Sequence, residues 1–486
     1  MKDRADGDVE SIQKIPIASP TPPAESPPDV SDKRLNDLGY KTEFRRNMSL
    51  FGVLGISFCA IGILTGMSSA FQTGLFSGGP LGLFWGWNTG WVYSIAMVFT
   101  GTSGNLSVAL YLASLAEVGQ NRVLTRVEIA AIAWGVNIAS GVINTVGTRA
   151  IGGMSAFNLW WTLGGTFVLV ITLLVKAPVR NPADFVFTDF QNFTGWSNRG
   201  FVVLLGFLQA VYTLEGCETA AQVAEEAQRA ELLAPLAVVG SIAGSWLIGL
   251  AYMLALLFSV QSIARVQSTS YALPITQLYY DAVGPRLTLM CLTVVALAQF
   301  MASVTAFTAS SRLFYALSRD NAFPMKTWFM TLNRYQAPYW GVWVSVLVGC
   351  IISCAYIGSA IAFNAILSSA AIAVMLSYLQ PILIRVFWPS TSLPERGPFN
   401  LGRWSWVINL ASFMFAVFIC VLFILPTAYP VNTLDMNYAI VAIGAIILIV
   451  ALCWFVWGNS HFVGPVKTIL VNETGGENEK VFSEVD

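Results

Sequence analysis

Two glutamates and a glycine lie together at the end of an apolar, uncharged stretch of the sequence. Residues 200–214 carry no acidic residue, and Glu215, Gly216 and Glu218 follow directly. A carboxylate surrounded by hydrocarbon is costly, so it usually faces a water-filled path or a bound cation. Because Glu215 and Glu218 are three positions apart, they share a face if this part is helical. The pair can then hold an ammonium group or exchange a proton, with burial favouring the protonated acid.

Tyr212 and Thr213, one turn earlier, extend this candidate site with an aromatic ring and a hydroxyl. An aromatic face over an ammonium is favourable by about 0.5 to 2 kcal/mol. The alternative is that the glutamates mark a helix end at a membrane surface, continuous with Glu225 and Glu226. The residues alone leave both interpretations open.

A second candidate site is the run Thr65, Gly66, Met67, Ser68 and Ser69, inside the first long apolar stretch. Glycine lowers helix propensity, and hydroxyls can satisfy backbone groups that a helix break sets free. Amide donors at the start of the second half-helix would then meet a carboxylate. Close helix packing through small residues explains the same composition equally well.

The elements that position these residues are membrane spans. Hydrophobic residues make up 55% of the 486 residues and charged residues only 11%. A span needs about 20 apolar residues, and no alternating strand pattern is present. The sequence therefore predicts an all-α membrane protein, a polytopic helical bundle. Eleven spans are expected, near 49–76, 88–116, 125–147, 151–175, 200–222, 236–260, 286–316, 340–361, 364–388, 405–427 and 436–458.

The ends of the chain differ from this membrane domain, which we place at 35–460. Residues 1–34 are rich in Pro, Ser and acidic residues and cannot bury enough apolar surface to order themselves. We expect a disordered cytosolic tail there and a polar tail over 461–486. No short apolar core follows Met1, so the first span itself should direct insertion.

Several function classes find no support in the composition. The net charge of −1 gives no basis for a nucleic-acid partner, and there is no Gly-Lys dipeptide for a phosphate-binding loop. With a single histidine, paired histidines for zinc are absent. We therefore expect no enzyme activity, no catalytic residue, no cofactor and no metal site.

Four other polar residues lie within expected spans: Ser103, Asn105, Gln299 and Thr305. They can line a path for a solute or bond neighbouring helices. The second role is favoured for each of them, because interhelical polar bonds are common.

Lys and Arg predict the orientation of the chain, because cytosolic loops carry an excess of them. The basic cluster over 33–46 places the N terminus in the cytosol, and two later basic segments, 312–334 and 385–403, should be cytosolic as well. One crossing per expected span would instead put both later segments outside. One additional crossing before residue 150 repairs the count and places loop 176–199 outside, where Asn192-Phe-Thr194 is a glycosylation sequon. Either residues 49–116 fold as three tight spans, or the chain lacks one span.

Four motifs resemble a known family. They are Leu38-Gly-Tyr, Ser77-Gly-Gly-Pro-Leu-Gly-Leu-Phe-Trp-Gly-Trp87, Glu225-Glu226 and Ser311-Arg-Leu-Phe-Tyr-Ala-Leu-Ser-Arg-Asp-Asn-Ala-Phe-Pro324. Over residues 35–460 the chain resembles the fungal amino acid, choline and gamma-aminobutyrate (GABA) permeases of the amino acid-polyamine-organocation (APC) superfamily. In that family a second span and a following loop separate two aromatic-Gly-Trp clusters. Here Trp85-Gly-Trp87 runs directly into Asn88-Thr-Gly-Trp91, so the resemblance implies that the chain lacks the family's second span.

The resemblance implies an inverted-repeat fold, five spans plus five, with two extra C-terminal helices. It also implies that the first and sixth family helices are broken at the midplane, where their free ends hold the substrate. This favours the substrate-site interpretation of Thr65, Gly66, Met67, Ser68, Tyr212, Thr213, Gly216 and Glu218, with Glu215 and Glu218 as proton-coupling candidates. Relatives commonly carry Asp at the position of Glu218 after an aromatic residue, which Cys217 replaces here.

The expected function is secondary active transport of amino acids or small amines such as GABA or choline, by alternating access. Protons fit the resemblance better than sodium as the coupling ion. The expected partners are thus the small-molecule substrate, protons and the lipid bilayer, with the plasma membrane as the location. The missing span motivates two alternatives, a transport-inactive receptor or scaffold and a truncated permease isoform.

Overall fold

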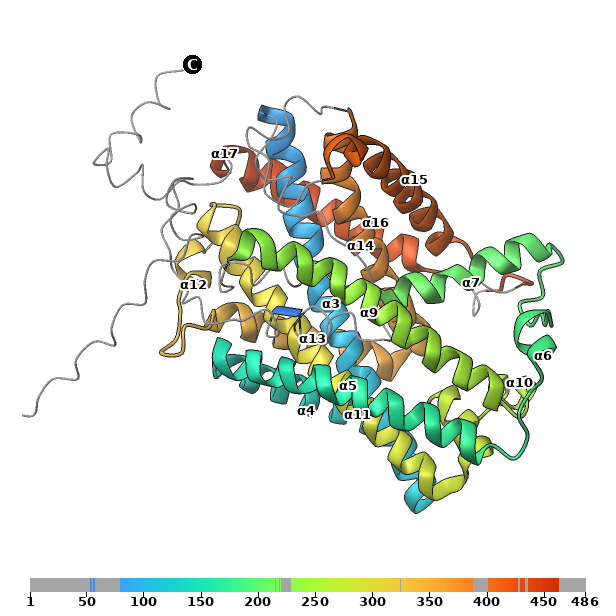
Figure 1. Ribbon diagram of the computed structural model, residues 1–486. Coiled ribbons are helices and arrows are strands. Elements are labelled where there is room, and N and C mark those ends of the chain that lie inside the picture. Colours follow the sequence, from blue (N-terminus) through green and yellow to red (C-terminus); the bar gives the residue numbers. More distant parts are fainter. Residues whose placement is uncertain are drawn as a thin grey trace, which may run out of the picture.

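The computed structural model describes residues 53–54, 56, 79–214, 216–217, 219, 229–323, 325–387, 401–426, 429–432 and 436–462. These residues form a bundle of long helices without a β-strand (Figure 1). The helices are α3 (Gly79–Gln120), α4 (Arg126–Thr145), α5 (Thr148–Lys176), α6 (Ala183–Phe187), α7 (Arg199–Leu214), α9 (Ala230–Ser259), α10 (Ile263–Gln267), α11 (Pro274–Arg319), α12 (Lys326–Phe329), α13 (Tyr339–Gly358), α14 (Ala360–Phe387), α15 (Ser405–Ile424), α16 (Ala439–Cys453) and α17 (Asn459–His461).

Within the described residues, nine helices are long and apolar enough to cross a membrane. Each of them overlaps one of the eleven expected spans. Of the other two, 49–76 lies almost entirely outside the described residues, and 200–222 corresponds to α7, which ends earlier than expected, at Leu214. The polytopic helical bundle predicted from composition is therefore confirmed.

Local sequence signals explain several helix ends. Thr125 caps α4 and forms a capping box with Glu128, so the first backbone donors of this helix are satisfied. Pro274 begins α11, where its missing N–H costs nothing. Further along, α11 kinks at Gly284, whose φ of 76° suits glycine, and Pro285 follows it.

Hydrogen bonds made by loop residues define two opposite ends of the bundle. At one end, Asn333 Nδ2 donates to the Thr145 carbonyl over 2.6 Å, and Trp91 Nε1 donates to the Ala322 carbonyl over 3.0 Å. At the other end, the Tyr429 amide donates to the Thr194 carbonyl over 2.7 Å. Figure 1 shows the short helices α12 and α10 at these opposite ends.

The helices that run from one end of the bundle to the other determine at which end each charged loop lies. Because α11 ends at the first end, α13 leaves it and α14 returns to it, segments 312–334 and 385–403 are attached to the same end of the bundle. Loop 176–199, with its sequon, lies at the opposite end. The charge pattern required this arrangement, with the two basic segments at one end and loop 176–199 at the other. Eleven crossings or twelve give the same relative positions, because the additional crossing comes before residue 150 and reverses all three together. Trp91 of α3 lies at the end of the basic loops as well, through its bond to Ala322.

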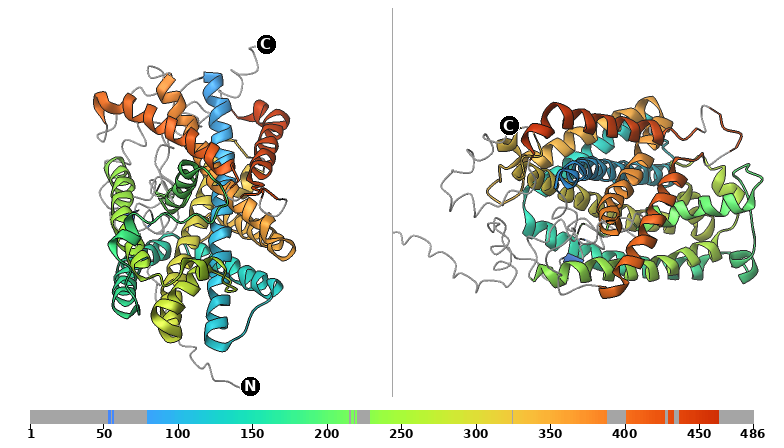
Figure 2. Two further views of the ribbon diagram at one scale, coloured as in Figure 1. Left: turned by 90° about the vertical axis from the view of Figure 1, so that its right-hand side faces the viewer. Right: turned by 90° about the horizontal axis from the view of Figure 1, so that it is seen from above.

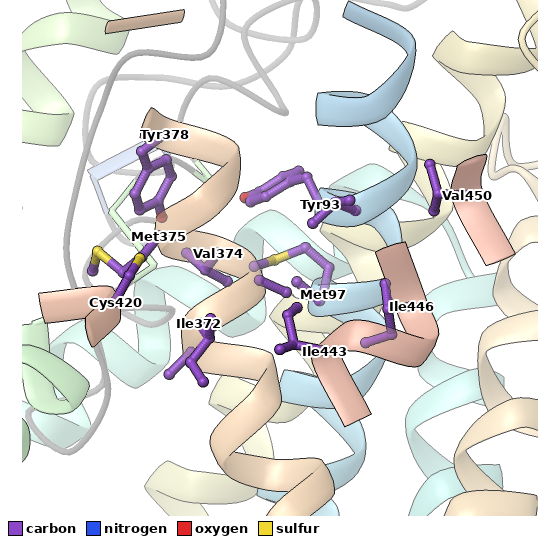
Figure 3. Close-up of a cluster of buried hydrophobic side chains, with 14 of the residues drawn as sticks. Tyr93, Met97, Ile372, Val374, Met375, Tyr378, Cys420, Ile443, Ile446 and Val450 are labelled. Atoms are coloured by element: carbon purple, nitrogen blue, oxygen red, sulfur yellow. The ribbon is translucent and has the colours of Figure 1, made fainter. Parts of the chain in front are cut away.

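Two apolar clusters hold the bundle together. The larger one packs α3 against α14 and α16, with Tyr93, Met97, Tyr378 and Ile443 among its members (Figure 3). The other joins α5, α9 and α11 around Leu173 and Leu292. The views of Figure 2 show α3 running through the length of the bundle.

Helix α3 packs most closely against α11. A Cβ added at Gly101 would lie 2.5 Å from Phe307 Cδ1, and one added at Gly104 would overlap Ser303 Oγ. Such close approach through glycine is a common way to pack membrane helices, where van der Waals contact replaces the hydrophobic effect.

Candidate functional site

The structure describes only some of the residues that the sequence analysis assigns to the site. Thr65, Gly66, Met67, Ser68, Glu215 and Glu218 lie outside the described residues. The backbone of Tyr212 and Thr213 forms the last turn of α7, and Gly216 follows the end of that helix. The predicted assembly of these residues into one site stays a prediction.

The backbone at Gly216 turns the chain out of the helix. Its φ is 104°, which L side chains rarely adopt, and α9 begins only at Ala230. Thr219 supports the turn, because its Oγ1 donates to the Gly216 carbonyl over 2.8 Å. The expected span 200–222 is therefore interrupted within one or two residues of Leu214, in the helix that the family resemblance implied to be broken; we call this interruption the α7 break.

The α7 break lies inside the bundle. Cys217 is fully buried and Thr219 is 2% exposed. Cys217 belongs to a small apolar cluster with Val53 and Ile56, from the first apolar stretch, and with Ala237 of α9. The last carbonyl groups of a helix carry partial negative charge and have no partner within the helix. A buried helix end of this kind suits a cationic ligand or a hydrogen-bond donor.

A chain of buried hydrogen bonds joins four helices elsewhere in the bundle. Asn105 Nδ2 of α3 donates to Asn137 Oδ1 of α4 over 2.8 Å, and Ser140 Oγ donates to Asn105 Oδ1 over 3.1 Å. Asn137 Nδ2 in turn donates to Ser353 Oγ of α13 over 3.4 Å. For Asn105, the structure therefore shows the interhelical role that the sequence favoured.

The same chain reaches α11 through Asn144. Its Nδ2 donates to the Val304 carbonyl over 3.0 Å, and its Oδ1 accepts from Thr308 Oγ1 over 2.6 Å. We call the six side chains of this network the polar seam: Asn105, Asn137, Ser140, Asn144, Thr308 and Ser353. All are at most 1% exposed. The polar residues of α4 were not predicted from the sequence to join neighbouring helices, although Asn137, Ser140 and Asn144 recur at helical spacing.

A cavity of about 50 Å³ lies between α5, α9 and α11. We call this space the polar cavity. Five polar side chains line it: Asn158, Thr162, Thr166, Tyr252 and Gln299. Thr162 Oγ1 donates to Asn158 Oδ1 over 3.3 Å. Gln299 therefore differs from Asn105, because it faces a cavity that can hold a few water molecules.

Charged groups gather near the end of the bundle that carries α10. Arg265 Nη2 lies 3.0 Å from Asp281 Oδ1, which also accepts from Gln277 Nε2 over 2.9 Å. Burial raises the pKa of Tyr271. The charges of Tyr280, Glu117 and Asp281 raise it by smaller amounts, so the phenol stays protonated at neutral pH. Among the described residues, no three His, Cys, Asp or Glu side chains group to hold a metal ion.

The chain is similar to known proteins over most of its length. A family model described as amino acid permease matches residues 47–451. The chain is 28% identical to the amino-acid permease BAT1 homolog of Oryza sativa subsp. japonica, with 91% of this chain and 96% of the relative covered. It is 29% identical to amino-acid permease BAT1 of Arabidopsis thaliana, covering 91% and 97%. It is also 26% identical to amino-acid permease 2 of Neurospora crassa, covering 92% of each.

Proposed function

Because the chain belongs to the amino acid permease family, we propose that it is a secondary active transporter that moves amino acids or related small amines by alternating access. An integral membrane protein of this family carries a small-molecule substrate across the bilayer. The described residues contain no group of metal-ligating side chains, and the family's members are transporters rather than enzymes.

The observation that carries this proposal is the α7 break. A transport site needs polar groups at the membrane midplane that are not consumed by helix hydrogen bonds. The turn at Gly216 supplies such groups in the interior, beside Cys217 and Thr219 and against the segment that contains Ile56. Thr219 Oγ1 also lies 3.5 Å from the Ile56 carbonyl.

In the proposed site, the two ends of the substrate meet different partners. The amide groups of Thr65, Gly66, Met67 and Ser68 bind the substrate carboxylate at a half-helix start. Tyr212, Thr213, Gly216 and Glu218 surround the ammonium group, with the carbonyls at the end of α7 adding negative potential. GABA and α-amino acids use both halves, whereas choline uses only the cation half.

We further propose that protons drive transport and that Glu215 or Glu218 carries the proton. A buried carboxyl releases its proton when an ammonium or water reaches it and rebinds one when the site empties. In this arrangement the N terminus is cytosolic and the protein resides in the plasma membrane. Loop 176–199, at the end opposite to the basic loops, is then external.

Uptake measurements test the proposal directly. Cells lacking their own permeases and expressing the chain should accumulate labelled alanine, GABA or choline in a saturable manner that increases as external pH falls. Surface expression is measured in the same cells. Saturable uptake that ignores external pH would remove the proton coupling, and no uptake despite normal surface expression would refute transport.

One observation favours a second candidate, a transport-inactive or truncated permease. The alignment to the rice relative runs over 502 residues although this chain has only 486, so the relative contains residues that this chain lacks. The abrupt junction of Trp85-Gly-Trp87 with Asn88-Thr-Gly-Trp91 is where we place the gap. Restoring the missing segment from a relative should restore uptake if its loss is the cause of inactivity.

A further inference from the structure

The polar cavity has an organised lining. Asn158, Thr162 and Thr166 follow one another at intervals of four on α5, so they share one face of that helix. Gln299 faces them from α11, and Tyr252 closes the cavity from α9. Polar side chains from three helices therefore line a single space, although the Tyr252 hydroxyl is bonded to that of Tyr279.

Two of these side chains have no hydrogen-bond partner among the described residues. They are Thr166 and Gln299, both only partly exposed. An amide in an apolar surrounding needs a hydrogen-bond partner, which water or a ligand in the cavity can supply. The polar seam shows the contrast, since its amides bond to one another or to backbone carbonyls.

The size and charge of the cavity restrict what fits. A cavity volume of about 10 to 15 Å³ holds one water molecule. The volume of about 50 Å³ therefore holds a few water molecules or one small polar group. None of the lining side chains is charged, and Leu169, Val294 and Val295 form an apolar wall. A charged group would lose its hydration without meeting a counter-ion. An uncharged amide or hydroxyl group would find both donors and acceptors.

The cavity also lies near the proposed transport site. Leu54 packs both against the cluster that contains Tyr252 and Leu169 and against the cluster of Ile56 and Cys217. The first apolar stretch thus connects the two regions, because its residue Leu54 packs against the apolar cluster beside the cavity and against the one beside the break.

We propose that the polar cavity is a specificity pocket that binds the uncharged polar side chain of a transported amino acid, an amide or a hydroxyl. This inference rests on the proposed function and extends it to the substrate class. Gln299 and Thr166 supply the hydrogen bonds, and the apolar wall excludes charged side chains. Glutamine, asparagine, serine and threonine are the substrates that this pocket favours over alanine.

The test compares uptake of labelled glutamine and alanine by the unmodified chain and by Thr166→Val, which removes one hydroxyl at nearly constant volume. The glutamine efficiency, as maximal rate over KM, should fall by roughly ten-fold relative to alanine, which is the typical effect of one lost hydrogen bond. Thr166→Ser should restore the preference. Thr293→Val, on the exposed side of α11, is the matched control, and surface expression is measured for each variant.

The outcomes separate this inference from the proposed function. No alanine uptake by the unmodified chain would refute transport itself. Alanine uptake with an unchanged glutamine preference in Thr166→Val would overturn the pocket alone. An equal fall for both substrates would also overturn it and assign the cavity to structural water.

Discussion

The polar seam and the polar cavity contain the same kinds of side chain in the same membrane bundle, but they differ in how these side chains are bonded. In the seam, Asn105, Asn137 and Asn144 bond to one another, to hydroxyls and to backbone carbonyls. In the cavity, Gln299 and Thr166 are part of the lining, and no described residue bonds their side chains. The polar groups of the seam form hydrogen bonds between helices, whereas Gln299 and Thr166 in the cavity are available to a ligand.

Helix α11 contributes to both regions. Thr308 lies in the seam and Gln299 lies in the cavity, nine positions apart. With 3.6 residues per turn, nine positions correspond to opposite faces of a helix. One side of α11 is therefore fastened to α4, while the other side borders the space between α5 and α9. This difference predicts that substitutions in the two regions act on different properties.

The largest effect is expected for Asn144→Leu in the seam. The change removes its bonds to Thr308 and to the Val304 carbonyl, and interhelical bonds in membranes contribute about 0.6 to 1.7 kcal/mol each. We expect a loss of about 2 kcal/mol in the free energy of unfolding, measured by thermal unfolding in detergent. Asn409→Leu is the control, because among the described residues its side chain bonds only to Ser405 of the same helix. An equal loss in both variants would contradict the fastening role of the seam.

A smaller effect is expected for Gly104→Ala at the contact of α3 with α11. The added methyl overlaps Ser303 Oγ and lies 2.9 Å from Gln299 Nε2. Overpacking costs typically 1 to 3 kcal/mol, but a side chain that can move lowers this cost. We expect about 1 kcal/mol of destabilisation together with a changed substrate preference, because Gln299 must shift. Gly135→Ala, with open space around its Cβ, should change neither property.

The smallest effect on stability is expected for Gln299→Met in the cavity. Because no described residue bonds the Gln299 amide, the substitution breaks no hydrogen bond among the described residues, and the side-chain volume is nearly conserved. The free energy of unfolding should stay within about 0.5 kcal/mol of the unmodified chain. Glutamine uptake should nevertheless fall relative to alanine uptake. A strongly destabilised variant would show that Gln299 holds helices together, as Asn105 does.

Much of the fold follows from the sequence, because membrane spans are long and their composition is distinct. The charge pattern also required that segments 312–334 and 385–403 lie at one end, and the loop contacts agree. Composition and charge are local signals, so a single sequence is sufficient to read them. The end of α7 at Leu214 is different, because the expected span 200–222 ran through it and only the family resemblance implied a break in this helix.

The difference between seam and cavity could not be predicted in this way. Asn105 and Gln299 are both isolated amides in apolar stretches, and only the neighbouring helices decide which of them finds a partner. The spacing of Asn137, Ser140 and Asn144 indicates a polar face on α4 but does not identify its partner helix. Likewise, three polar residues at intervals of four on α5 do not reveal that α9 and α11 leave a space beside them.

The most direct test of the proposed transport site is equilibrium binding of labelled glutamine and alanine to the purified chain, with Glu218→Gln compared with Thr166→Val. We predict that Glu218→Gln abolishes binding of both amino acids, because it removes the negative partner of the ammonium group that they share. Thr166→Val should weaken glutamine alone. Unchanged affinity of both amino acids for Glu218→Gln would contradict a substrate site at the α7 break.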